Sequence, residues 1–283
     1  MKCYLFFLSL FFIACKKENT DKPVSIDALI VNETQVSSNP KFAVGQFLKI
    51  RPHFNDSRSD LTISWMLTPN ANQPFEENES LLVWRPASTG KFNIDLSVKS
   101  TSGKEVSKQY TFETIPADIR YNLWGSSYVD VDLNEQVNES EYNELIMQRG
   151  GYIIKNSDVS NGRNDNIQPG ESIFYFYNDK MKLAGAEVEI SIPGQLDAES
   201  RRTYYEAMRL NRLSDYTYLG HDNQFASPEY VAQYQDHPEL WTEAVRLGRM
   251  VLIDVYENER TTVMISWAGG YTITLNYSAK QNF

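Results

Sequence analysis

The sequence of 283 residues contains no hydrophobic run long enough to cross a membrane as a helix. Its apolar N-terminal stretch, residues 4–14, is interrupted only by Ser9. At about 1.5 Å per helical residue, this stretch reaches roughly 16 Å, against about 30 Å of hydrocarbon. Because Lys2 places a positive charge just before it, residues 1–14 are typical of a secretory signal peptide rather than of a membrane span.

Cysteine is almost absent. Only Cys3 and Cys15 occur, and Cys3 lies in the segment that we expect to be removed. The mature chain then holds one cysteine and no internal disulfide, so its stability must come from apolar burial.

The sequence also lacks the signatures of common enzymes. It has no Gly-x-Ser-x-Gly elbow and no phosphate-cradling glycine loop. The three histidines, His53, His221 and His237, show no metal-ligand spacing, although His221 and His237 each neighbour an aspartate. Paired carboxylates are abundant, but a glycosidase needs two acids at a spacing visible only in three dimensions. We therefore expect a protein that is not an enzyme.

Positive charge is scarce as well. The formal charge is −10, and removal of Lys2 with the signal leaves −11. A chain this acidic repels phosphate backbones, and no basic patch with interleaved aromatics offsets this. We expect no nucleic-acid partner.

A processing motif is present at the end of the apolar stretch. Phe12, Ile13, Ala14 and Cys15 resemble the lipobox of bacterial lipoproteins, in which a small residue precedes a cysteine that is lipidated and becomes the new N-terminus. Phe12 stands where Leu is usual. The resemblance implies that acyl chains such as palmitate on Cys15 tie the protein to a membrane, and a multiply acylated terminus is a lasting anchor.

The residues after Cys15 resemble the surface-export signal of Bacteroidota lipoproteins, a lysine followed by acidic residues. Lys17 and Glu18 fit this pattern, whereas Asn19 stands where a second acid is usual. The resemblance implies an outward-facing position on the bacterial outer membrane. The alternative is an ordinary solvated tether, because residues 15–23 are polar and lack periodicity.

Residues 24–115 are predicted to form an antiparallel β-sandwich. Short segments alternate apolar and polar residues, as strands with one buried face do. Ser102 and Gly103 mark a hairpin turn. The clearest strands are residues 47–50, 61–65, 80–84 and 92–98.

Two segments of this region resemble PKD and related immunoglobulin-like modules. Residues 63–65, Ile-Ser-Trp, supply the core tryptophan of such modules, and residues 89–104 supply the glycine turn, the strand and the hairpin glycine. The Asp-Phe-Gly-Asp-Gly segment of PKD modules is missing, so the resemblance is to a PKD-like module. Such modules serve as spacers or as binding surfaces, and the fold does not choose between them.

Residues 118–283 are predicted to form one α+β domain with an antiparallel sheet, which makes the whole chain mainly β. A helix is expected over residues 197–215, and Ser227 and Pro238 each mark a helix start. We recognise no named family here. The predicted strands are residues 171–177, 186–192, 250–256, 261–267 and 271–277.

One stretch of this domain resembles the EF-hand calcium loop. Asp130, Asp132, Asn134 and Glu141 occupy ligand positions of that loop, whose oxygen ligands suit a hard cation. Glu135 stands where the loop needs glycine, so a solvated acidic loop is the alternative. Residues 158–171 are also rich in oxygen-bearing side chains, a composition that tight turns select as well. Calcium is the one cofactor that the sequence suggests.

Aromatic residues make up 13% of the chain, which is above what a plain sandwich demands. Exposed aromatic faces stack on sugar rings, whereas aromatic residues in strands are explained by packing. Five of them lie near predicted turns, and we expect these to be exposed for ligand binding: Trp124, Tyr128, Tyr216, Tyr218 and Trp267.

These observations favour a lipid-anchored, non-catalytic binding protein with a PKD-like spacer and a C-terminal ligand-binding domain. A glycan is the favoured ligand. The alternatives are a structural or assembly subunit that holds other envelope proteins, and an unrecognised hydrolase.

Overall fold

The computed structural model describes residues 24–36, 39–54, 61–69, 75–78, 80–138, 146–148, 151–155, 171–192, 196–269 and 272–281. The predicted signal peptide and Cys15 lie outside these residues. Within them, no helix is long and apolar enough to cross a membrane.

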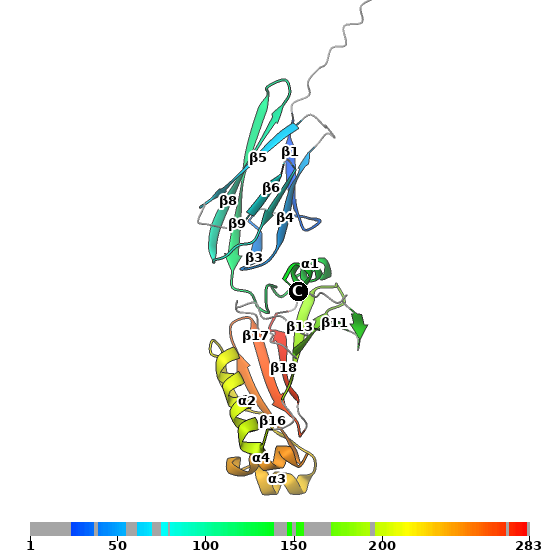
Figure 1. Cartoon of the computed structure of the whole chain (residues 1–283), viewed down its shortest axis with the longest axis vertical. Helices are drawn as coiled ribbons and strands as arrows, with labels where there is room; N and C mark the ends of the chain where they lie inside the picture. The colour runs from blue at the N-terminus through cyan, green and yellow to red at the C-terminus, as the bar shows by residue number, and fades with distance from the viewer. Residues whose placement is uncertain are drawn as a thin grey trace, which may run out of the picture.

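The N-terminal part is a β-sandwich of two sheets (Figure 1). One sheet has the order β2 (Thr34–Gln35), β1 (Ile26–Val31), β4 (Leu48–Phe54), β7 (Leu81–Trp84) and β6 (Phe75–Asn78). The other has the order β3 (Lys41–Ala43), β9 (Glu105–Ile115), β8 (Gly90–Ser100) and β5 (Leu61–Thr68). All pairs are antiparallel except β3 with β9, which differs from the prediction of a purely antiparallel sandwich.

The core of this sandwich is formed by every second side chain along its strands. In β8, Phe92, Ile94, Leu96 and Val98 are buried and alternate with more exposed residues. The β8–β9 hairpin turns at residues 101–104, where Gly103 has a φ of 85° that suits glycine. The predicted sandwich and its hairpin are therefore confirmed.

The C-terminal part is built on one large antiparallel sheet. Its strands lie in the order β10 (Ile146–Gln148), β11 (Gly151–Lys155), β12 (Glu171–Tyr177), β13 (Leu183–Ser191), β18 (Thr272–Ala279), β17 (Thr261–Trp267), β16 (Met250–Glu257) and β14 (Thr217–His221). A short strand, β15 (Gln224–Phe225), also pairs with β16. The expected α+β fold with an antiparallel sheet is confirmed, although the sequence predicted neither β10, β11, β14 nor β15.

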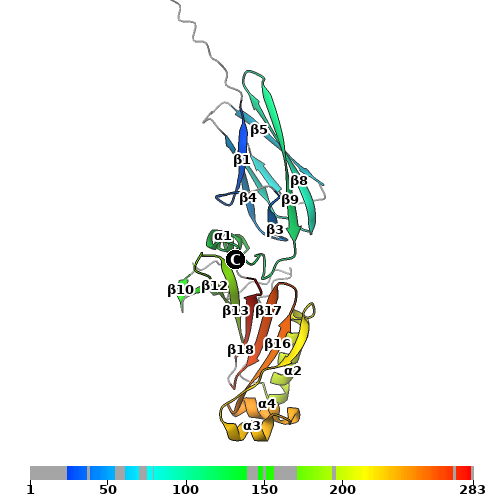
Figure 2. The same cartoon turned by 180° about the vertical axis from the view of Figure 1, so that it is seen from behind.

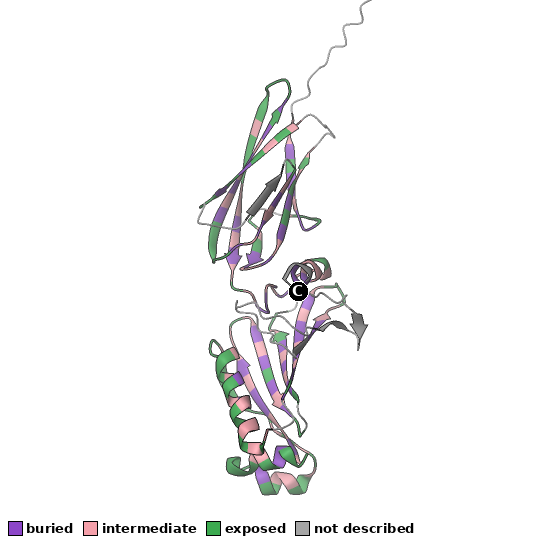
Figure 3. Ribbon diagram, viewed as in Figure 1, coloured by how far each residue is buried: buried purple, intermediate pink, exposed green. Residues whose placement is uncertain are grey.

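Helices lie along this sheet and at its two ends (Figure 2). They are α1 (Tyr128–Asn138), α2 (Ala198–Arg212), α3 (Pro228–Tyr234) and α4 (Trp241–Arg246), with a single 3₁₀ turn, η1 (Pro238–Leu240), before α4. Helix α2 lies along β16 and β17, and its exposed residues point away from the sheet (Figure 3).

Local sequence explains where α2 begins and how it is oriented. The Asp197 side chain accepts a hydrogen bond from the Ser200 backbone N–H at 2.8 Å, which caps the first turn. Tyr205 and Met208 are buried against the sheet. The predicted supporting pair is present, since Arg202 Nε lies 2.9 Å from Glu206 Oε1 on the outer side.

Helix α1 joins the sandwich to the C-terminal sheet. Asn134 Oδ1 accepts a hydrogen bond from the Phe47 backbone N–H at 2.8 Å. Asn32 Nδ2 donates to Asp130 Oδ1 at 3.1 Å. Tyr121, which precedes α1, packs against Gly45, where an added Cβ would lie 2.5 Å from the Tyr121 ring. Specific contacts from both parts of the chain therefore meet at α1.

Candidate functional site

The two tryptophans predicted to be exposed are buried instead. Trp124 is 3% exposed, and its Nε1–H donates to Thr261 Oγ1 at 2.8 Å. Trp267 is 2% exposed and stacks on Tyr205 at a centroid distance of 5.8 Å. Both belong to the hydrophobic core of the C-terminal domain. The prediction that Trp124 and Trp267 present ring faces to a ligand is therefore wrong.

The three predicted tyrosines differ in exposure. Tyr128 is half-buried, packed edge-to-face against Tyr177 at 6.0 Å, and Tyr216 is half-buried against the core. Tyr218 is 43% exposed, as expected. Of the five predicted aromatic residues, Tyr218 therefore offers the most accessible ring.

The calcium-loop interpretation is corrected for the residues that the structure describes. Residues 128–138 form helix α1 rather than a loop, so Asp132 points to a different side from Asp130 and Asn134. Asp130 accepts from Ser127 Oγ at 2.6 Å and Asn134 donates to Asn122 Oδ1 at 2.7 Å.

The side-chain oxygens of Asp130 and Asn134 are thus used for structural hydrogen bonds. Glu141 and residues 158–170 lie outside the described residues. Within the described ranges, no group of three or more histidine, cysteine, aspartate and glutamate side chains is arranged to hold a metal ion.

A different group of side chains gathers around Asp254 on β16, a carboxylate only 1% exposed. Asp254 Oδ1 lies 2.5 Å from His221 Nδ1 and 3.4 Å from the Tyr218 hydroxyl. Asp254 Oδ2 accepts from the Tyr205 hydroxyl at 2.8 Å and lies 3.4 Å from Arg209 NH1. We call these five residues the Asp254 cluster.

The fold brings this cluster together from three elements. Strand β14 pairs with β16 so that His221 lies opposite Asp254. A bulge between Tyr218 and Gly220 inserts one residue, which places Tyr218 and His221 on the same face of β14. Gly220 has a φ of 135°, a conformation that glycine adopts at no steric cost.

Helix α2 supplies the remaining two groups. Tyr205 and Arg209 are four residues apart and therefore lie on one face of the helix, toward β16. Burial and the nearby Asp254 carboxylate raise the pKa of Tyr205 well above its ordinary value of 10.0. The same two causes raise the pKa of Tyr218 to about 12. Both hydroxyls therefore remain protonated donors at physiological pH.

Aromatic rings extend from this cluster across the surface. The Tyr218 and His221 rings meet edge-to-face at 5.6 Å, and the His221 and Trp241 rings do so at 4.6 Å. Trp241 is fixed by its Nε1–H, which donates to the Tyr234 carbonyl at 2.7 Å. We call Tyr218, His221 and Trp241 the aromatic strip. The His221 side chain is 39% exposed and Trp241 is half-buried, so the strip is accessible but held in place.

Next to the aromatic strip, two tyrosines of α3 contact Arg249. The Arg249 guanidinium sits over the Tyr230 ring at 5.4 Å, and Arg249 NH1 donates to the Tyr234 hydroxyl. The Tyr234 carbonyl also accepts the hydrogen bond from Trp241. Contacts between α3 and α4 therefore hold Trp241 of the aromatic strip in place.

Of this site, the sequence predicted only Tyr218 as a ligand-binding residue. His221 was considered only as a metal ligand, and the sequence analysis did not identify the other site residues, which are Asp254, Arg209, Tyr205 and Trp241. A signal for Asp254 existed, because an acidic residue inside the apolar strand 250–256 requires a partner when it is buried.

A separate buried ion pair stabilises the region around α1. Arg120 NH1 lies 2.9 Å from Glu135 Oε2, and both side chains are almost fully buried. Tyr175 donates its hydroxyl to Glu135 Oε1 at 2.6 Å. Burial, followed by the Glu135 charge, raises the pKa of Tyr175 well above its ordinary value. Because these groups are enclosed, we regard the pair as structural.

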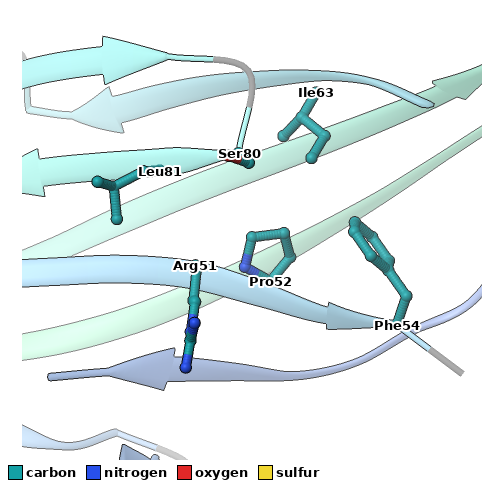
Figure 4. Close-up of a pocket in the computed structure, with 6 residues that line it drawn as sticks. All are labelled: Arg51, Pro52, Phe54, Ile63, Ser80 and Leu81. Atoms are coloured by element: carbon teal, nitrogen blue, oxygen red, sulfur yellow. The ribbon is translucent and has the colours of Figure 1, made fainter. Parts of the chain in front are cut away.

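The sandwich contains a pocket of about 360 Å³ (Figure 4). Its lining is mostly apolar and comes from β4, β5 and the start of β7. Arg51 is one of the residues that line it and is ion-paired with Glu33 at 2.5 Å. The lining residues are Arg51, Pro52, Phe54, Ile63, Ser80 and Leu81. This lining offers less polar chemistry than the Asp254 cluster does.

Comparisons with known proteins assign no family. No protein-family model matches the sequence, and no curated protein matches it. Among solved structures, a 2,6-sialyltransferase from Photobacterium aligns at 20% identity and a TM-score of 0.24, covering 28% of this chain and 17% of that one.

Two further structures align similarly. A nucleoside hydrolase-related protein from Saccharophagus degradans aligns at 12% identity and a TM-score of 0.24, covering 32% and 26% of the two chains. SGBP-B from the mixed-linkage glucan utilization locus of Bacteroides ovatus, in complex with a mixed-linkage heptasaccharide, aligns at 12% identity and a TM-score of 0.26, covering 60% of this chain and 44% of that one. TM-scores this low carry no argument about fold or function.

Proposed function

We propose that this chain is a lipid-anchored protein of the bacterial outer membrane that faces outward and binds glycans without catalysis, through the aromatic strip. The observation that carries the proposal is a set of half-exposed rings fixed over a buried, fully hydrogen-bonded carboxylate. Sugar rings are recognised by such a combination, since an aromatic face stacks on their C–H groups and adjacent polar groups fix their orientation.

The strip is preorganised, which favours binding. His221 is held by Asp254 and contacted by the rings of Tyr218 and Trp241 on either side. Few side-chain rotamers therefore need to be frozen when a ligand arrives, so less of the contact energy is lost to ordering.

The position of the strip also suits a tethered binding protein. In Figures 1 and 2, the β-sandwich, which contains the first strand β1, lies at one end of the molecule. Helices α3 and α4 lie at the opposite end. With a lipid on Cys15, the sandwich acts as a spacer that holds the aromatic strip away from the membrane. The specific contacts at α1 keep the two parts aligned.

A glycan array tests this function. Tyr218→Ala removes the most exposed ring of the strip and should abolish or strongly weaken retention of a glycan that the unchanged protein binds. Met264→Ala is the matched control, because Met264 is 40% exposed against 43% for Tyr218 but lies on the opposite face of the sheet. No glycan retained by the unchanged protein, or equal retention by Tyr218→Ala, would remove the proposal.

A further inference from the structure

We propose that the Asp254 cluster selects a neutral sugar, with His221 Nε2 accepting a hydrogen bond from one hydroxyl and Arg209 donating to another oxygen of the same ligand. This inference rests on the proposed function, because it assigns the ligand class of that same site. It follows from the hydrogen-bond pattern, the exposure and the charge of the cluster.

The hydrogen bond to Asp254 fixes what His221 offers to a ligand. Nδ1 lies 2.5 Å from Asp254 Oδ1, so Nδ1 carries the hydrogen and donates it to the carboxylate. In the neutral imidazole, Nε2 then keeps its lone pair and is an acceptor. Since the side chain is 39% exposed, this acceptor is available to a hydroxyl that approaches the aromatic strip.

Arg209 supplies complementary donors beside it. NH1 is directed at Asp254 Oδ2, on the other oxygen of the carboxylate that holds His221. The guanidinium has five N–H groups, and its side chain is 31% exposed, so donors remain for a ligand oxygen. A sugar hydroxyl both donates and accepts, and adjacent hydroxyls therefore satisfy an acceptor and a donor that are held side by side.

The charge of the cluster disfavours an anionic ligand. With a neutral His221 imidazole, the one cation of the cluster, Arg209, is paired with its one anion, Asp254, which leaves no net charge to attract a carboxylate or sulfate. The Nε2 lone pair would also repel an acceptor-only group. The chain as a whole carries −10, which adds long-range repulsion. Uronic and sulfated sugars are therefore selected against.

The experiment compares neutral and acidic ligands of equal length on the full chain. Hexasaccharides of glucose, galactose and mannose are each paired with their uronic-acid counterparts, and the affinity of each is measured by calorimetry. We expect at least one neutral hexasaccharide to bind, its uronic-acid counterpart to bind at least about tenfold more weakly, and His221→Phe to weaken the neutral ligand by at least about tenfold, a change of about 1.4 kcal/mol.

His237→Phe is the matched control, because His237 also faces a carboxylate, Glu239, at 3.0 Å, but both groups are exposed. It should leave the affinity unchanged. His221→Gln, which retains a donor for Asp254 and an acceptor for the ligand, should recover part of it, and this variant also serves if His221→Phe fails to fold.

Each adverse outcome has a distinct meaning. Equal or tighter binding of the uronic-acid ligand, or full affinity in His221→Phe, overturns the selection of neutral sugars and leaves glycan binding in place. The array gives a second test. If it retains only acidic glycans and this retention depends on Tyr218, the selection of neutral sugars is likewise overturned while glycan binding remains. Absence of all glycan retention overturns the proposed function and this inference together.

Discussion

Asp254 is the residue on which the geometry of the site depends. Its carboxylate is bonded to His221, Tyr205, Tyr218 and Arg209, and it is 1% exposed. A buried carboxylate is tolerated only when donors surround it, and here those donors are the groups that line the surface site. One side chain therefore couples the stability of the α2–β16 contact to the orientation of the groups that we propose bind the ligand.

Alkaline pH should destabilise the protein through Tyr205. Its folded-state pKa lies above the ordinary value of 10.0, so the unfolded state loses its proton first as the pH rises. Stability is thus retained below about pH 10 and falls above it, by up to about 1.4 kcal/mol per pH unit for this group. Urea unfolding between pH 8 and 11 should show a shallower decline for Tyr205→Phe. An identical decline in the variant and the unchanged protein would show that Tyr205 is not the titrating group.

Trp267→Ala should destabilise the C-terminal domain by about 3–5 kcal/mol, because it opens a cavity beside Tyr205 in a closely packed core. Denaturant unfolding measures this loss. Leu210→Ala, at a position 65% exposed, should change stability by less than about 0.5 kcal/mol. A small effect at Trp267 would mean that its ring is not part of the core.

The burial of Trp267 was available in the sequence, whereas the Asp254 cluster was not. Val263, Ile265 and Trp267 alternate along one strand, so they share a face, and this period of two outweighs the nearness of Trp267 to a turn. The pairing of His221 with Asp254 depends on the register of β14 and on its bulge. Both are tertiary features, set by strands separated by two helices, and no local pattern reveals them.

Among the elements, α1 shows how a stretch that resembles a calcium loop in sequence can serve another purpose. Asp130 and Asn134 both carry side-chain oxygens of the kind that bind calcium. Because they are four residues apart, however, they lie on one face of a helix. There they bond to Asn32 and Phe47 of the sandwich. Their polarity serves the junction between the two parts of the chain.

Asn134→Ala should therefore weaken this junction. The Phe47 N–H loses its acceptor, and a partly buried donor left without one costs about 1–3 kcal/mol. Differential scanning calorimetry should show a lower or split transition. Val129→Ala on the same helix, at a position 49% exposed, is the control and should leave the melting profile unchanged. Equal profiles for both variants would exclude a junction role for Asn134.

At the scale of the whole molecule, the strands were predicted better than their arrangement. Residues 261–267 were predicted as a strand and form β17 with those same limits, because alternation and flanking turns define a strand locally. The parallel β3–β9 pair and the addition of β14 to the sheet edge depend on contacts distant in sequence.

The proposed lipid anchor determines where the whole protein resides. Cys15→Ala should release the protein from the membrane fraction, because it removes the thiol that we propose is acylated and leaves a chain of net negative charge without a lipid. Membrane fractionation and intact-mass spectrometry measure the change. Acyl mass on the variant, or an unmodified Cys15 in the parent protein, would contradict the proposed lipid anchor.

The histidine rings can be observed directly during ligand binding. The chain has three histidines, so a ¹⁵N-edited imidazole spectrum contains three ring systems that single substitutions assign. On titration with a neutral hexasaccharide, we expect the Nε2 resonance of His221 to shift in a saturable manner while those of His53 and His237 stay fixed. Saturable binding that leaves His221 unperturbed would place the ligand away from the Asp254 cluster and exclude the proposed site.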